Sequence, residues 1–342
     1  MNLRKWIGAL SLLGALAVGG HSQAQTTLSF SIWVPPTHPI YAGMVAPWAE
    51  QVAKVTDGRV KINILPKPLG GPPQHFDLAR DGVADVMYTV HGYTPGRFAL
   101  TKMAELPFLG NDAEATSVAY WRVHEKYFAK ADEHQGVKVL GVFTHGPGLI
   151  FTTNKAVKGL DDMKGLKFRV GGGIVNDVAK ALDMVAVLKP ATESYELLSN
   201  GVVDGVLFPM ESVRSFKLAP LLKHATEFPG GLYNTSFLIG MNQAKFDKLS
   251  PQDQQAIMSV SGEAFARLAG QAWDKYDRQA GEDFKAAGGT VLKASPEFVE
   301  EVRKRTASIE QAWIAEVKAK GVDGAAALAE FREHIKALNK TQ

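Results

Sequence analysis

The sequence contains no cysteine, and this absence excludes several kinds of protein. Disulfide bonds and thiolate metal sites are impossible, so the fold must derive its stability from the size of its core. For an exported protein, this is more typical of a bacterial periplasm than of small disulfide-rich secreted domains. The nine histidines are scattered without metal-ligand spacing, and we expect neither a metal ion nor another cofactor.

Motifs of the common enzyme classes are also missing. The chain has no G-x-S-x-G, no H-E-x-x-H and no G-x-x-x-x-G-K-[ST]. The three glycines at residues 171–173 do not continue as G-x-G-x-x-G, so support for a dinucleotide site is weak. A Ser-His-Asp triad assembled in space leaves no sequence signature, so an exported hydrolase is an alternative. Our prediction is a protein that is not an enzyme.

Neither sign of charge is in large excess, with 38 Lys and Arg against 35 Asp and Glu. Arg4 and Lys5 are the only charged residues among the first 24, which leaves 36 basic and 35 acidic residues in the remaining 318. A nearly neutral chain argues against nucleic acid or a membrane surface as the main partner. Short-period repeats and low-complexity segments are missing too, which disfavours a structural or adhesion protein.

Residues 1–24 have the pattern of a secretory signal peptide. A basic start precedes an uncharged apolar segment (residues 6–20), and small residues precede Gln25. An uncleaved membrane anchor is the alternative, but the apolar run is short for a membrane span. We expect cleavage after Ala24 and a periplasmic protein long enough to form two lobes.

Two stretches of the chain resemble each other, DGVADVMY at residues 81–88 and NGVVDGVL at residues 200–207. Each follows a helix-like segment, breaks it with glycine, turns through aspartate and enters an apolar run typical of a buried strand. They begin 119 residues apart, too far for a solenoid repeat. We interpret them as the same joint in two similar α/β lobes, with a ligand cleft between the lobes. The alternative is a common turn that recurs by chance.

Periodicity and turn residues predict the other elements. Strands are expected at residues 28–34, 59–65, 138–143, 149–153, 167–170 and 233–241, and helices at 40–55, 176–182, 194–199, 295 onward and 324–340. Pro47 inside the first helix implies a kink or a later start. A capped start at Ser250, with no stop before Gly288, predicts a helix of on the order of 36 residues that crosses both lobes. The alternative is two helices broken near Gly270.

Arg169 is the strongest candidate for ligand binding. It ends a short expected strand and precedes three glycines. Strand ends in α/β folds face the binding crevice, and glycines let backbone N–H groups approach an anion. A guanidinium binds a carboxylate through two parallel hydrogen bonds, which lysine cannot reproduce. The alternative is a structural arginine paired with an aspartate of its own lobe.

An ordered set of motifs covers essentially the whole mature chain. It comprises PPTHP (35–39), RDGVAD (80–85), GYTPGRF (92–98), ELPFL (105–109), GLKFR (165–169), YELL (195–198) and GVVDG (201–205). Together they resemble the DctP-type solute-binding proteins of tripartite ATP-independent periplasmic (TRAP) transporters. No single motif is decisive, but their order is specific.

This resemblance implies an α/β, two-lobe periplasmic binding protein fold with a hinge and a long helix bridging the lobes. It implies that Arg169 is the carboxylate-binding arginine, and that the partners are the small and large membrane subunits of a sodium-driven transporter. We expect lobe I at residues 25–148 and about 235–275, lobe II at 149–234 and about 276–320, and a C-terminal helix at 321–342 packing on both. A receptor for an ATP-driven importer or a sensor would share this fold.

Two departures from the family pattern concern the ligand. Sugar-acid binders usually follow the second Val-Asp-Gly with Gln-Glu-Asn-Pro, whereas this chain has Val-Leu-Phe208-Pro. Leu149 stands where sialic-acid binders have a second arginine. Both changes favour a carboxylate on an aromatic or hydrocarbon body. A 2-oxo or 2-hydroxy aromatic mono-acid is the first candidate, and a C4-dicarboxylate held through Arg97 is the second.

Several further residues are candidates for contact with the ligand. They are Trp33 and His38 where the first strand enters its loop, Tyr88, His91 and Tyr93 at or after the end of the first of the similar stretches, Phe208 after the second, and Gly171, Glu211, Tyr233, Asn234 and Phe237. Arg97 either holds a second carboxylate or caps a turn. His145, near the expected crossing between the lobes, is equally suited to a structural role. For any one aromatic residue, packing in the core is the ordinary role.

Overall fold

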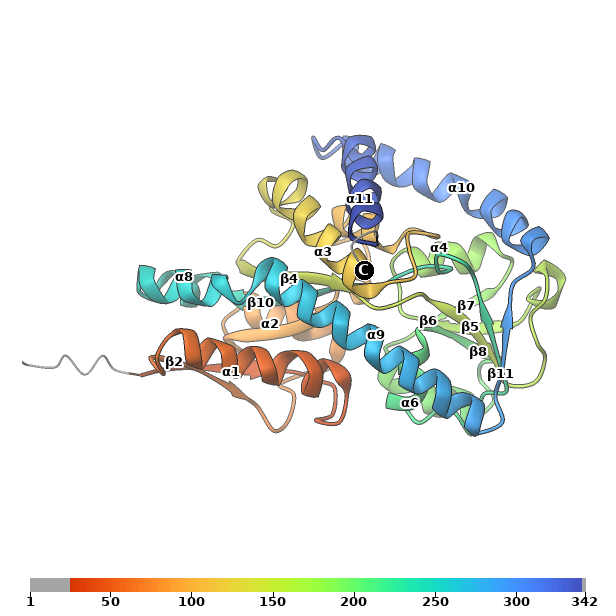
Figure 1. Ribbon diagram of the computed structural model, residues 1–342, viewed down its shortest axis with the longest axis horizontal. Coiled ribbons are helices and arrows are strands. Elements are labelled where there is room, and N and C mark those ends of the chain that lie inside the picture. Colours follow the sequence, from red (N-terminus) through yellow and green to blue (C-terminus); the bar gives the residue numbers. More distant parts are fainter. Residues whose placement is uncertain (1–24, 340–342) are drawn as a thin grey trace, which may run out of the picture.

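Two β-sheets organise the chain in the computed structural model, which describes residues 25–339. The expected signal peptide at residues 1–24 lies outside the described residues. One sheet has the strand order β2-β1-β3-β10-β4, and the other has the order β11-β9-β5-β8-β6-β7. We call the half built on the first sheet lobe I and the half built on the second lobe II. Figure 1 shows the two lobes side by side, with helix α9 running diagonally across both.

In the sheet of lobe I, β1 is parallel to β2 and β3, and β10 is antiparallel to β3 and β4. The strands are β1 (Thr26–Ser31), β2 (Val60–Ile64), β3 (Val86–Val90), β4 (Val137–Thr144) and β10 (Ser236–Asn242). The α-helices are α1 (Ala46–Val55), α2 (His75–Arg80), α3 (Ala113–Val123), α7 (Gln243–Asp247) and α8 (Pro251–Ser259). A π-helical turn (Ile40–Val45) precedes α1, so Pro47 lies in the first turn of α1 and marks a later start instead of a kink.

Lobe II is built from shorter strands. They are β5 (Leu149–Thr152), β6 (Lys167–Val170), β7 (Val185–Leu188), β8 (Gly205–Phe208), β9 (His224–Glu227) and β11 (Thr290–Lys293). Its helices are α4 (Ile174–Ala181), α5 (Ser194–Ser199), α6 (Met210–Ser215) and α10 (Pro296–Lys318). The C-terminal helix α11 (Gly324–Asn339) packs against α3 and α10.

The two similar sequence stretches form the same joint, one in each lobe. Gly82 (φ +75°) follows α2 and Gly201 (φ +66°) follows α5, in a backbone conformation that favours glycine. The Asp85 carboxylate then accepts a backbone N–H of β1, and the Asp204 carboxylate accepts a backbone N–H of β6, each at 2.8 Å. The interpretation of two similar α/β lobes is confirmed.

Helix α9 (Gly262–Ala286) bridges the lobes, touching α3 and β4 in lobe I and α6 and β11 in lobe II. The expected uninterrupted helix of about 36 residues is wrong, because α8 ends at Ser259 and α9 restarts at Gly262 with φ +58°. The break is not near Gly270 either. A Cβ atom on Gly270 would overlap the backbone of Glu114, so this glycine lets α9 and α3 cross closely.

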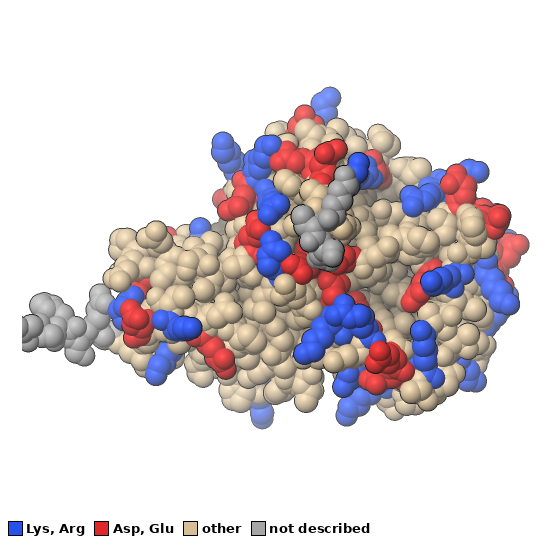
Figure 2. All heavy atoms as spheres, viewed as in Figure 1, with Lys and Arg blue, Asp and Glu red and all other residues tan. Residues whose placement is uncertain are grey.

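The face shown in Figure 2 carries lysine and arginine interspersed with aspartate and glutamate, without a large patch of one sign. Along residues 25–339, every helix is too short or too polar to cross a membrane.

Candidate ligand-binding site

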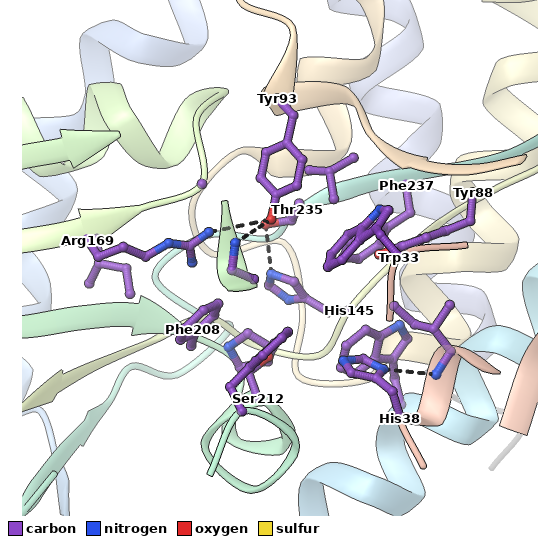
Figure 3. Close-up of a pocket in the computed structure, with 18 of the residues that line it drawn as sticks. Trp33, His38, Tyr88, Tyr93, His145, Arg169, Phe208, Ser212, Thr235 and Phe237 are labelled. Carbon is purple, nitrogen blue, oxygen red and sulfur yellow. Dashed lines mark hydrogen bonds between the residues drawn. The ribbon is translucent and has the colours of Figure 1, made fainter. Parts of the chain in front are cut away.

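A cavity lies where the two lobes meet, and it is lined mainly by aromatic and aliphatic residues. Lobe I contributes Trp33, His38, Ile40, Tyr88, Val90, Tyr93 and Phe237, and lobe II contributes Arg169, Gly171, Ala191, Leu207, Phe208, Pro209, Ser212 and Phe216. The segments that cross between the sheets and α9 contribute His145, Tyr233, Thr235 and Trp273. Figure 3 draws 18 of these residues and shows the labelled side chains, among them Arg169, Tyr93, Phe208 and Trp33, around the cavity.

Arg169 is a buried cation in the wall of this cavity, with 2% of its surface exposed. Its Nε donates to the Lys189 carbonyl at 2.8 Å, and its Nη2 donates to the Tyr93 hydroxyl at 3.5 Å. Only two of the five guanidinium N–H groups therefore have a partner, and no carboxylate within residues 25–339 forms an ion pair with it. Burial lowers the pKa of Arg169 below its usual value.

The neighbours of Arg169 compensate its charge only in part. The Phe208 ring lies 4.4 Å from the guanidinium carbon, which gives a cation–π contact. Phe208 in turn stacks on Phe216, with 5.8 Å between ring centroids. A buried charge without a full ionic partner is costly, so the arrangement favours binding of an anion.

Tyr93 joins the two lobes at the edge of the cavity. Its hydroxyl oxygen accepts the Ala191 backbone N–H at 2.9 Å, in addition to the Arg169 contact, which leaves its own O–H free to donate. Beside it, a Cβ atom on Gly92 would lie 2.7 Å from the carbonyl carbon of Gly172, so only glycine permits this close approach. The two lobes are therefore in contact at this edge of the cavity.

Two histidines line the cavity in the neutral state. Burial lowers the pKa of His38 to about 3 and the pKa of His145 to about 4. His38 Nδ1 accepts the Ile40 N–H at 3.2 Å, so the ring proton is on Nε2. His145 Nε2 lies 2.9 Å from the Thr235 hydroxyl. Arg169 is therefore the one fixed positive charge among the residues that line the cavity.

Aromatic rings form most of the remaining wall. Trp33 packs on Tyr88 and Tyr93, with centroid distances of 5.4 and 5.9 Å, and Phe237 stacks on Trp273 at 5.9 Å. The Trp33 indole N–H is buried without a hydrogen-bond partner among the described residues. The wall therefore offers mainly apolar surface together with a few unused donors.

The structure brings eight of the twelve expected site residues together around the cavity. They are Trp33, His38, Tyr88, Tyr93, His145, Arg169, Gly171 and Phe208. Tyr233 and Phe237 lie there too, while Ser212, Phe216, Thr235 and Trp273 were not anticipated. Trp273 and Phe216 lie on or directly after helices, where an aromatic residue predicts ordinary core packing, so the sequence carries no signal that sets them apart.

The other four expected residues are not among those that line the cavity. The Arg97 guanidinium binds both oxygens of Asp77, at 2.8 and 3.2 Å. His91 contacts the Ser236 hydroxyl at 2.8 Å and the His134 ring at 2.9 Å.

Glu211 and Asn234 contact residues that line the cavity. Glu211 accepts the Ser212 hydroxyl at 3.2 Å and lies 3.9 Å from His38 Nε2. With its amide oriented to satisfy its hydrogen bonds, Asn234 donates to the Gly146 carbonyl at 2.8 Å. Across residues 25–339, no group of three or more His, Asp or Glu side chains is arranged to hold a metal ion.

A comparison with protein families identifies the family to which this chain belongs. The family described as bacterial extracellular solute-binding protein, family 7 (DctP), matches residues 30–316. The chain belongs to the DctP family. DctP proteins are solute-binding receptors rather than enzymes. This DctP protein is thus a periplasmic solute-binding protein of the kind that serves TRAP transporters.

Several relatives are similar over nearly their whole length. A TRAP solute-binding protein from Bordetella bronchiseptica, solved with bound (R)- and (S)-mandelate, is 51% identical with a TM-score of 0.90, covering 92% of this chain and 99% of that one. A protein from Rhodoferax ferrireducens with copurified benzoate is 31% identical with a TM-score of 0.87, covering 93% and 99%. The outer membrane transporter protein TsaT of Comamonas testosteroni is 33% identical over 97% of this chain and 98% of its own.

Proposed function

We propose that this DctP protein captures a small monocarboxylate with an aromatic or similarly apolar body and delivers it unchanged to its transporter. The observation that carries the proposal is Arg169, a buried cation without a carboxylate partner in residues 25–339, set in an aromatic wall. A carboxylate would supply the missing ionic partner, and a ring would fill the apolar part of the cavity. The mandelate and benzoate bound to related proteins support this ligand class.

In the proposed complex, Arg169 donates two parallel hydrogen bonds to the carboxylate, and the free O–H of Tyr93 donates a third. Phe208 and Trp33 pack against the ring from opposite lobes. Tyr88, His38, His145 and Gly171 complete the proposed contact set. For His91, Arg97, Glu211 and Asn234, which do not line the cavity, we propose a supporting role.

A C4-dicarboxylate is the second candidate, and the charges in the cavity disfavour it. The residues that line the cavity provide one fixed cation, because both histidines there are neutral and Arg97 is bound to Asp77 elsewhere. A second carboxylate would be buried without an ionic partner, which costs several kcal/mol.

We propose capture by closure of the lobes, with the boundaries expected above. Residues 25–148 with about 235–275 would form lobe I, and residues 149–234 with about 276–320 would form lobe II. These boundaries require the chain to cross between the lobes more than once. Strand β10 belongs to the sheet of lobe I and the later strand β11 to the sheet of lobe II, which supports such crossings. Closure would remove water from around Arg169 and strengthen its attraction to the carboxylate.

Calorimetric titration with benzoate and (R)-mandelate, their uncharged amides and succinate would test the proposal. We expect the two acids to bind at least 30-fold more tightly than their amides, because the amides leave Arg169 without an ionic partner. Succinate should bind more weakly than either aromatic acid. Equal affinity for acid and amide, or preference for succinate, would contradict the proposal. Chemical change of an acid recovered after incubation would contradict delivery of the ligand unchanged.

A further inference from the structure

Glu105 is a buried carboxylate outside the ligand cavity, with 1% of its surface exposed. It is the last residue of a 3-10 helix (Leu100–Glu105), which comes between β3 and β4 in the sequence of lobe I. One carboxylate oxygen accepts the Ser236 backbone N–H at 3.0 Å, and the other accepts the Ile174 backbone N–H at 2.9 Å. We call these two hydrogen bonds the Glu105 bridge.

The two donors belong to different lobes. Ser236 begins β10, directly after the segment of residues 228–235 that crosses from lobe II to lobe I. Ile174 begins α4 in lobe II and follows the short loop that joins Arg169 on β6 to this helix. The Glu105 bridge therefore connects the crossing segment to the part of lobe II that presents the ligand-binding arginine.

Glycines near the Glu105 bridge allow the two lobes to come close together. Gly173, which precedes Ile174, has φ +71°, and a Cβ atom there would overlap the Glu105 carboxylate. Another interlobe contact, between Gly92 and Gly172, lies along the same loop. An N–H at the first turn of α4 also favours a negative partner through the helix dipole.

We propose that Glu105 is a positioning residue, whose carboxylate holds lobe II closed and fixes the Arg169 loop over a bound ligand. The inference depends on the proposed function only for the ligand used in its test. Opening of the lobes separates Ile174 from Glu105 and returns both groups to water. Because a ligand enters the open form and leaves only after opening, loss of the bridge acts mainly on the dissociation rate.

Glu133 provides a matched control within the same chain. Its carboxylate is also buried, with 5% of its side chain exposed, and it accepts two backbone N–H groups, from Ala99 at 2.9 Å and Leu100 at 2.8 Å. Both donors belong to lobe I, so these hydrogen bonds do not span the lobes. Glu133 also forms an ion pair with the exposed Lys320 at 3.2 Å, and Lys320 belongs to the segment expected in lobe II, so Lys320→Ala is measured as well to separate the effect of this pair. A substitution at Glu133 otherwise removes the same kind of backbone contact within lobe I.

The test compares Glu105→Gln with Glu133→Gln by stopped-flow fluorescence with (R)-mandelate. At pH 8 the Glu105 carboxyl, whose pKa burial raises to about 7, is ionised in the wild-type protein. Glutamine keeps the volume but presents an NH₂ group to one of the two N–H donors. We expect the dissociation rate of Glu105→Gln to rise about tenfold or more, with the association rate changed less than about threefold. Glu133→Gln should retain the wild-type dissociation rate. A folded Glu105→Gln protein with the wild-type dissociation rate would overturn the inference.

A second variant covers the case in which Glu105→Gln does not fold. Ile174→Pro removes the interlobe donor at the first position of α4, where proline is well tolerated, and it also changes a buried side chain. Ile174→Val is the control for a smaller side chain at this buried position. The proline variant should show the faster dissociation and the valine variant should not. Equal rates in the two variants would contradict the bridge.

A measurement without ligand separates this inference from the proposed function. The chain has no cysteine, so spin labels can be placed at Val83→Cys and Val202→Cys, which are exposed positions in the equivalent joints of the two lobes. We expect Glu105→Gln to shift the interlabel distances toward the open form relative to Glu133→Gln. Failure of wild-type protein to bind aromatic acids would reject the proposed function alone, whereas unchanged distances would reject the bridge.

Discussion

The chemistry of the cavity depends on the charge of Arg169 and on the residues placed around it. Its position at the end of β6, before three glycines, could be predicted from the sequence because strand ends face the crevice in α/β folds. The absence of a carboxylate partner in residues 25–339 could not be predicted, since it depends on which acidic side chains the two lobes bring near it. Phe208 and Tyr93 are placed around it by different lobes.

Replacing Arg169 with lysine should weaken binding of benzoate or mandelate by roughly 30-fold or more, because an ammonium group cannot form two parallel hydrogen bonds to a carboxylate. Calorimetric titration would measure the loss. Arg97→Lys is the control, because Arg97 binds Asp77 away from the cavity. The affinity of this variant for benzoate or mandelate should stay within about threefold of the wild-type value. Similar losses in both variants would argue against a special role for Arg169.

Replacing Phe208 with asparagine should lower affinity for aromatic acids by about tenfold or more. The change removes the ring that lies 4.4 Å from Arg169 and stacks on Phe216, and such contacts contribute on the order of 1–2 kcal/mol each. Phe208→Leu keeps an apolar side chain and should lose less. A thermal-shift panel of aromatic acids would show the difference, and an unaltered ligand profile for Phe208→Asn would contradict the role of the ring.

Helices and strands were predicted unevenly, for reasons that can be named. The sequence predicts β5 and β6, of four residues each, as well as the longer β1, β2, β4 and β10. Strands β7, β9 and β11, also of four residues, were missed, and they differ from β5 and β6 in being only partly buried. The prediction of one uninterrupted helix missed the break between α8 and α9, and the alternative break near Gly270 was in the wrong place, because Gly262 and Gly270 look alike in sequence. Only packing distinguishes them: Gly262 adopts positive φ, whereas Gly270 lies against α3.

Two glycines inside α9 should respond oppositely to alanine. Gly270→Ala places a methyl group into the Glu114 backbone and should lower the free energy of unfolding by about 1–3 kcal/mol. Gly281→Ala meets only Met210 Cγ at 3.7 Å and should be neutral or stabilising by up to about 1 kcal/mol, since alanine favours helix. Urea unfolding followed by circular dichroism would measure both. Equal effects would show that Gly270 is not needed for the helix crossing.

For the molecule as a whole, stability depends on pH through buried histidines. Burial lowers the pKa of His91 to about 3 and of His124 to about 4. The unfolded chain therefore binds more protons below pH 6.5, so the stability they contribute is complete above pH 6.5 and is lost as the pH falls toward these values. Burial raises the pKa of Glu105 and Glu211 to about 7, which acts in the opposite direction over the same range.

His124→Phe isolates one of these contributions. The His124 ring is buried among Trp121, Phe128 and His134, and its Nδ1 has no hydrogen-bond partner within the described residues, so phenylalanine suits the site. Between pH 7.5 and pH 5 the wild-type protein should lose about 2 kcal/mol more stability than the variant. Urea unfolding at the two pH values would test this. The acidic groups are common to both proteins, so an equal loss would contradict the buried neutral state of His124.

Local patterns in the chain were enough to predict two similar α/β lobes, the candidate arginine and a helix near the crossing, because backbone geometry and burial follow from short stretches of sequence. The positions of the lobe boundaries stay a prediction. Contacts between distant residues were decided only by folding: Tyr93 meets Ala191 across the cavity, and Glu105 meets Ile174 beside it. Such pairs depend on how two separately packed sheets come to face each other, and no periodicity within either segment encodes that arrangement.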